Sequence, residues 1–222
     1  MKYQIKPATM SVEINAAWDA PCWKDVEALR VVNARPEGSN HRPETELKLQ
    51  YDEKGLYGLF YVKDFYVKSV HTEFQASVCR DSCVEFFFET AAEKSGYFNL
   101  EMNAGKGMLM YYVRDNSRAG DAFADFDILP AEDLDMGQKF DTMPDVVDPE
   151  IAAPTEYRVG FHIPYALIQK YTGCQLPKPG IFWRMNVYKC GDRTSHPHWI
   201  SWNPVRALNF HSPEDFGVLE FC

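Results

Sequence analysis

The sequence lacks any long apolar run and any excess of positive charge. No stretch approaches the roughly 18 consecutive apolar residues of a membrane-spanning helix, so we expect no membrane partner. The opening residues MKYQIKPATMSVEI lack the basic and then apolar block of a secretion signal, which leaves the location of the protein open. With 23 basic and 32 acidic residues, the formal charge is −9, and such a field repels nucleic acid as well as anionic membranes.

The cysteines lack the spacing of a metal or redox motif. None of the six stands in a C-x-x-C pair, and a chain of 222 residues is long enough to form a stable core without disulfides. Cys79 and Cys83 are four residues apart beside an acid, but zinc takes four ligands and no second close pair follows. We therefore expect free, mostly buried thiols in a reducing compartment, and no required cofactor.

Short strand-like segments dominate what is present. Fourteen prolines and thirteen glycines, without a heptad or longer repeat, favour short strands and turns over long helices. Strand patterns occur at residues 45–51, 56–64, 83–89, 97–103, 108–114, 157–163, 182–189, 198–202 and 218–221. This many strands predict an all-β fold, a two-sheet antiparallel β-sandwich of jelly-roll type, built as one domain over residues 1–222.

Two segments interrupt the strand pattern. PYALIQKYTG (164–173) has an early proline, apolar residues at helical spacing and a final glycine, which together predict one short helix. Residues 116–155 are acidic and contain prolines, and we expect them to form a long insertion loop with at most brief local structure.

The segments 83–89, 97–103 and 182–189 each have two different faces, because side chains alternate across a strand. The apolar face holds Val84, Phe86, Phe88, Phe98, Leu100, Met102, Trp183, Met185 and Val187. The opposite face holds Cys83, Glu85, Phe87, Asn99, Glu101, Asn103, Arg184, Asn186 and Tyr188. If these strands share a sheet, the second face is a polar platform.

Such a platform has two interpretations. A sugar would pair its hydroxyls with carboxylates and amides and stack its C–H faces on aromatic rings. An ordinary exposed antiparallel sheet carries similar residues on its solvated face, with charge pairs across the strands. The alternation alone favours the solvated face.

Several phrases occur in an order that resembles a known family. They are EINAAWDAPCW, YDEKGLYGLFYVKD, RDSCVEFFFE, GYFNLEMNAGKG, YRVGFHIPYALI, FWRMNVYK, SWNP and FHSPEDFGVLEF. In this order they resemble the family 9 carbohydrate-binding modules and their relatives, over nearly the whole chain. The resemblance implies an antiparallel β-sandwich that binds a carbohydrate without catalysis, often beside a polysaccharide-degrading enzyme.

The resemblance also implies a site in which two aromatic side chains flank a sugar ring. Carried over residue by residue, the hydrogen-bonding acid falls on Glu85, and the polar positions of two further strands fall on Asn99 and Asn186. One flanking aromatic falls on Phe210. The other would come just before RDSCVEFFFE, where residues 78–80 hold Val, Cys and Arg.

The second aromatic must therefore come from elsewhere in the chain. Phe74 is the nearest aromatic upstream of that block. Trp199 is a candidate from another strand, whereas Trp202, in SWNP, matches a family position that usually packs inside the fold.

The segment FHSPEDFGVLEF predicts a stiff corner after Phe210. Pro213 fixes its own φ and restricts Ser212, the two acids can cap turn amides, and Gly217 permits close backbone approach. A ring held in this way loses little entropy when it stacks on a ligand. The alternative is that Phe210 and Phe216 only plug the open end of the sandwich.

Other functions could use the same residues. Glu85 and Glu101 could form a glycosidase pair, but no pattern marks either one as desolvated, so we expect no enzyme activity. A β-sandwich that has lost its sugar and serves as a protein-interaction or other small-ligand module is the alternative function.

Haem and calcium are the two other ligands to weigh. Atoms suited to haem are offered by Met102, Met108, Met110 and His211, although strand methionines more often fill a core. Related modules often hold a structural calcium away from the sugar, and Asp64 resembles an acid found there. The acidic insertion lacks the D-x-D-x-D-G spacing of a dedicated calcium loop.

Overall fold

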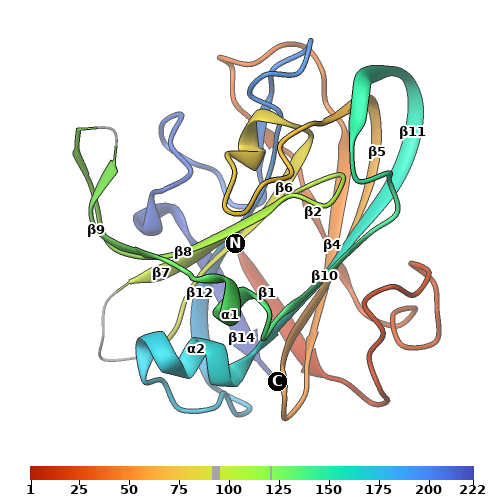
Figure 1. The fold of residues 1–222 in the computed structure, drawn as a ribbon. Helices are drawn as coiled ribbons and strands as arrows, with labels where there is room; N and C mark the ends of the chain where they lie inside the picture. The colour runs from red at the N-terminus through yellow and green to blue at the C-terminus, as the bar shows by residue number, and fades with distance from the viewer. Residues whose placement is uncertain (92–95, 121) are drawn as a thin grey trace.

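The computed structural model describes residues 1–91, 96–120 and 122–222, which form two β-sheets packed face to face (Figure 1). Sheet A contains β3 (Asn33–Ala34), β6 (Cys83–Glu89), β7 (Tyr97–Asn103), β8 (Met108–Ala119), β9 (Ala122–Ile128), β12 (Phe182–Cys190), β13 (Trp199–Ser201) and β14 (Gly217–Phe221). Sheet B contains β2 (Ala28–Val31), β4 (Glu44–Tyr51), β5 (Gly55–Ser69), β10 (Gln138–Asp141) and β11 (Val147–Pro164). The prediction of an all-β sandwich is confirmed.

Strand β1 (Lys2–Pro7) joins the two sheets. Its residues 2–5 pair in parallel with β14 of sheet A, and residues 6–7 pair in parallel with β4 of sheet B. The other strand pairs of the described residues are antiparallel, as predicted. Sheet A then continues from β14 through β12, β6, β7 and β8 to β9.

The core lies between the sheets and is formed by the face predicted to be apolar. All nine side chains assigned to that face on β6, β7 and β12 belong to one buried cluster. Phe86 of sheet A stacks on Phe161 of sheet B, with ring centroids 5.4 Å apart. The two-residue period of a strand is sufficient to sort these side chains correctly.

The predicted helix is present as α2 (Tyr165–Thr172). Pro164 precedes its first turn, and Gly173 ends it in the left-handed region, with a φ of 67°. In Figure 1 this helix lies at the lower end of the sandwich. None of the helices in the described residues is long and apolar enough to cross a membrane.

The acidic segment 116–155 differs from the expected loop. It contains the end of β8, all of β9, the helix α1 (Ala131–Leu134), β10 and the first part of β11. The acids do not prevent strand formation, because they lie on exposed edges and some find partners: Arg114 bonds both Asp125 and Asp127. The segment thus extends sheet A at β9 and sheet B at β10.

Candidate functional site

The polar face of sheet A is covered by other parts of the chain. Glu85 is 2% exposed, and Asn99 and Asn186 are equally buried. Val205 and Phe216, from the segment 203–216, pack with Phe87 and Tyr188 over part of this face. The interpretation as a solvated sheet face is therefore wrong, because a segment distant in sequence shields it from water.

A pocket of about 350 Å³ remains open where this cover ends. Its lining combines carboxylates, one guanidinium, thiols and aromatic rings: Cys79, Glu85, Glu101, Arg118, Cys190, Asp192, Trp199, Leu208, Asn209, Phe210 and His211. Of the five predicted binding residues, Glu85, Phe210 and Trp199 line the pocket, while Asn99 and Asn186 lie behind its surface.

Phe210 lies at the wall of the pocket and is not an interior plug. Its ring is half-buried and stacks on Tyr188, with centroids 4.0 Å apart and planes inclined by 11°. The Tyr188 hydroxyl donates a hydrogen bond to the Phe210 carbonyl oxygen at 3.0 Å. One buried tyrosine thus fixes both the ring and the backbone of Phe210.

The corner after Phe210 is held by contacts with the rest of the chain. Pro213 begins a single 3₁₀ turn, Pro213–Asp215. The Asp215 carboxylate accepts hydrogen bonds from the backbone N–H and the Nε of Arg206. A Cβ on Gly217 would lie 2.6 Å from the Trp202 ring, so only glycine permits this approach.

Asn186 supports the corner. Its Nδ2 donates to the carbonyl oxygens of Asn203 and Asp215, and its Oδ1 accepts from the backbone N–H groups of Val187 and Asn203. These bonds join β12 to both ends of the segment 203–216. The amide predicted to bind sugar thus positions the segment that carries Phe210.

Asn99 orients a second acid that the sequence interpretation had set aside. Its Nδ2 donates to Glu101 Oε1 at 3.0 Å, and its Oδ1 accepts from the Tyr111 backbone N–H. Glu101 is the cross-strand partner of Glu85. Both carboxyl groups therefore face the pocket from neighbouring strands.

The two acids share an environment that opposes charge. Burial and the neighbouring carboxylate of Glu101 raise the pKa of Glu85 well above its ordinary value, despite a bond from the Cys190 thiol. Burial likewise raises the pKa of Glu101 to about 7, although the Asn99 amide acts against it. A protonated carboxyl beside a carboxylate can both donate to and accept from hydroxyl groups.

The second aromatic at the pocket is Trp199, whose Nε1 donates to Asp192 Oδ1 at 2.7 Å. Phe74 is 58% exposed and is not part of the lining, and Trp202 is buried in the core as expected. Arg118 and His211 also line the pocket and were not predicted to bind sugar, although His211 was considered as a haem ligand. Arg118 lies in the acidic segment expected to be a loop, so no strand pattern pointed to it.

The surroundings of Asp64 do not fit calcium. Its carboxylate lies 3.3 Å from Lys189 Nζ and 2.6 Å from His41 Nε2, and it accepts from the Phe65 backbone N–H. Although burial opposes it, the charge of Lys189 lowers the pKa of Asp64. Calcium takes about six to eight oxygen ligands, and here an ammonium group already serves as the cation, so the residues around Asp64 do not fit the predicted calcium.

The haem hypothesis fails on geometry. Met102 and Met110 belong to the core between the sheets, and Met108 packs against that core. His211 lines the pocket on the opposite face of sheet A. These atoms cannot converge on one iron.

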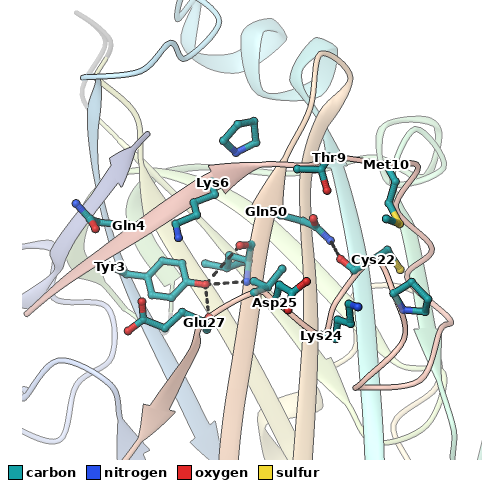
Figure 2. A pocket seen from close by; sticks show the side chains of 14 residues that line it. Tyr3, Gln4, Lys6, Thr9, Met10, Cys22, Lys24, Asp25, Glu27 and Gln50 are labelled. Carbon is teal, nitrogen blue, oxygen red and sulfur yellow. Dashed lines mark hydrogen bonds between the residues drawn. The ribbon is translucent and has the colours of Figure 1, made fainter.

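A second pocket, of about 440 Å³, lies between β1, β4 and the segment 9–27 (Figure 2). The Tyr3 hydroxyl donates to the Glu27 carbonyl oxygen, and Gln50 donates to the Cys22 carbonyl oxygen. None of the predicted site residues lines it.

Comparison with models of protein families assigns the chain to one family. The model of carbohydrate-binding family 9 matches residues 23–221. The chain therefore belongs to this family of carbohydrate-binding modules. A search of curated proteins found no match.

Solved structures share the fold across the full length. A Bacteroides uniformis protein, provisionally described as carbohydrate-binding, is 22% identical with a TM-score of 0.84, covering 99% of this chain and 98% of its own. A family 9 module from Caldicellulosiruptor kristjanssonii in complex with glucose is 13% identical with a TM-score of 0.65, covering 100% and 96%. The same organism's module with cellotriose is 15% identical with a TM-score of 0.61, covering 100% and 93%.

Proposed function

We propose that the pocket on sheet A binds a neutral carbohydrate and does not change it chemically. The observation that carries this proposal is the pocket itself, in which the Glu85–Glu101 pair faces a space bordered by the rings of Phe210 and Trp199. Hydroxyl groups and C–H faces in one ligand require this combination of partners. The family of the chain and the sugars bound to the Caldicellulosiruptor modules support it.

The residues have separate roles in this proposal. Glu85 and Glu101 bond sugar hydroxyls, and Phe210 and Trp199 stack on the sugar faces. Asn99 and Asn186 act indirectly, by orienting Glu101 and by holding the segment that carries Phe210. The Glu85–Glu101 pair, with its raised pKa values, suits hydroxyl groups better than a further carboxylate, so we expect the pocket to disfavour acidic sugars.

Hydrolysis does not suit this arrangement. Glycosidases place their two carboxyl groups on opposite sides of the scissile bond. Glu85 and Glu101 are direct partners on adjacent strands and approach a ligand from the same side.

Replacing Phe210 with alanine tests the proposal. A stacked ring contributes about 1 kcal/mol beyond burial, so Phe210→Ala should weaken sugar binding by about fivefold to tenfold. Isothermal titration with glucose and cellotriose, after a glycan array has identified the best ligand, measures the change. Phe74→Ala is the matched control, since this exposed ring lies outside the pocket and its loss should leave the affinity unchanged.

Two outcomes would contradict the proposal. Equal loss of affinity in both variants would place the sugar away from the pocket. Absence of binding to every glycan tested would favour the alternative, a sandwich that serves another ligand or a protein partner.

A further inference from the structure

Three potential metal ligands converge beneath the pocket of sheet A. Cys83 and Cys190 face each other across β6 and β12, and Glu85 lies two residues beyond Cys83 on the same face. Their sulfur and carboxylate oxygen atoms all lie within 4.8 Å of one another. The Cys190 sulfur lies 3.1 Å from Glu85 Oε1.

This cluster is buried, although two of its members border the pocket. Cys83, Glu85 and Cys190 are each at most 2% exposed. Glu85 and Cys190 line the pocket, and Cys83 lies behind them. A thiol is a weak hydrogen-bond donor, so the contact with Cys190 compensates poorly for the burial of a carboxylate.

The nearest lysine in sequence does not neutralise this cluster. Lys189 precedes Cys190 and therefore points to the other face of β12. There its ammonium lies 3.3 Å from Asp64 and 3.0 Å from His198. The charge of Lys189 therefore acts on the cysteine side only from the opposite face of the strand, without contact.

We propose that Cys83, Glu85 and Cys190 bind a divalent cation, with zinc the metal that their donors fit best. Two sulfur ligands favour zinc over calcium or magnesium, and a carboxylate oxygen completes a three-ligand set. Because all three side chains project from paired strands, their spacing is fixed before the metal arrives. The fourth position faces the pocket, where water or a ligand hydroxyl can occupy it.

The sequence did not indicate this site, because the two cysteines are more than a hundred residues apart. Only the pairing of β6 with β12 brings them together. The site goes beyond the proposed function, and metal uptake is measured without sugar, so either proposal can fail without the other.

Cobalt and zinc titration of the reduced protein tests the site. Cobalt should give thiolate-to-metal charge-transfer absorption in the near ultraviolet, and zinc should displace it at one equivalent per chain. Cys83→Ser and Cys190→Ser should each lose this absorption, and Glu85→Gln should weaken metal affinity by at least tenfold. Cys22→Ser and Cys222→Ser are matched controls that should behave like the wild type, since neither cysteine belongs to the cluster.

The wild-type protein offers a test that does not depend on the folding of variants. X-ray absorption at the zinc edge should show two sulfur ligands at about 2.3 Å, together with oxygen. The proposal is overturned if the reduced protein takes up neither metal, or if the zinc shell contains no sulfur. A Cys83–Cys190 disulfide in the protein as isolated would overturn it too.

Discussion

At the scale of single residues, the most informative group is the buried pair of Lys189 and Asp64. Lys189 is fully buried, and its ammonium contacts the Asp64 carboxylate and His198 between the sheets. Asp64 also accepts from backbone N–H groups, so its charge is well compensated. This pair supplies internally the positive charge that a calcium ion would otherwise bring.

From the Lys189–Asp64 pair we expect the stability of the protein not to depend on calcium. Lys189→Met should lower the free energy of unfolding by about 3 to 5 kcal/mol, because Asp64 would be left buried without its partner. Chelation of calcium should leave the melting temperature of the wild type unchanged. Denaturant unfolding and thermal melts measure both effects, and a large loss of melting temperature in chelator that added calcium, but not added zinc, restores would contradict the prediction.

His198 predicts a dependence of stability on pH. Burial and the charge of Lys189, whose Nζ lies 3.0 Å from Nε2, lower its pKa to about 3, although the bond from Nδ1 to the His196 carbonyl oxygen acts against them. The unfolded chain binds a proton near pH 6.5, whereas the folded chain does not. The stability due to His198 is therefore present above pH 6.5 and is lost as the pH falls toward 3.

The loss should reach about 2 kcal/mol between pH 7.5 and pH 5. Other groups titrate in this range, so the melting temperature of His198→Gln is compared with that of the wild type at each pH. The comparison isolates the contribution of the histidine. The amide has no charge to gain, and the melting temperature of the variant relative to the wild type should rise as the pH falls. If the difference in melting temperature between the variant and the wild type stays constant with pH, His198 is not held neutral.

At the scale of elements, the sequence predicted which face of each strand is apolar but not what covers the other face. The alternation on β6, β7 and β12 is a local signal, and it sorted the core residues correctly. The burial of Glu85 and Asn186 comes from the segment 203–216, whose position depends on contacts far along the chain. No local pattern contains that information.

The segment 203–216 also explains why the role of Asn186 could not be predicted. A polar residue on an outward face indicates hydrogen bonding, but not with which partner. Here the partners are backbone groups at Asn203 and Asp215. The acidic segment is a similar case, because β9 and β10 form through pairing with β8 and β11, which their charged sequence does not reveal.

Asn186→Ala should weaken sugar binding without removing a direct contact. Loss of the buried amide should cost about 1 to 3 kcal/mol of stability and should speed hydrogen exchange in residues 203–216. Gln50→Ala is the matched control, since this amide holds the segment 9–27 at Cys22 instead. Unchanged exchange in residues 203–216 of the Asn186 variant would show that the amide does not hold them.

At the scale of the whole molecule, the family and the sandwich were predictable because many short phrases occur in a fixed order. The crossing of β1 between the sheets was not, since one strand of six residues pairs with two different neighbours. The residues around the pocket come from β6, β7, β8, β12 and β13, from the turn Val78–Arg80, from Asp192 and from residues 208–211. Only three of them stood among the predicted binding residues, because a pocket is a property of the assembled surface.

The segment 203–216 is fixed at Asn203 and at Phe210. Asn186 holds Asn203, and the Tyr188 hydroxyl holds the Phe210 carbonyl, while residues 207–209 between these anchors are exposed. Leu208 and Asn209 nevertheless border the pocket. This short stretch can therefore be diversified as antibody loops are, and a library confined to it would alter ligand preference on an unchanged scaffold.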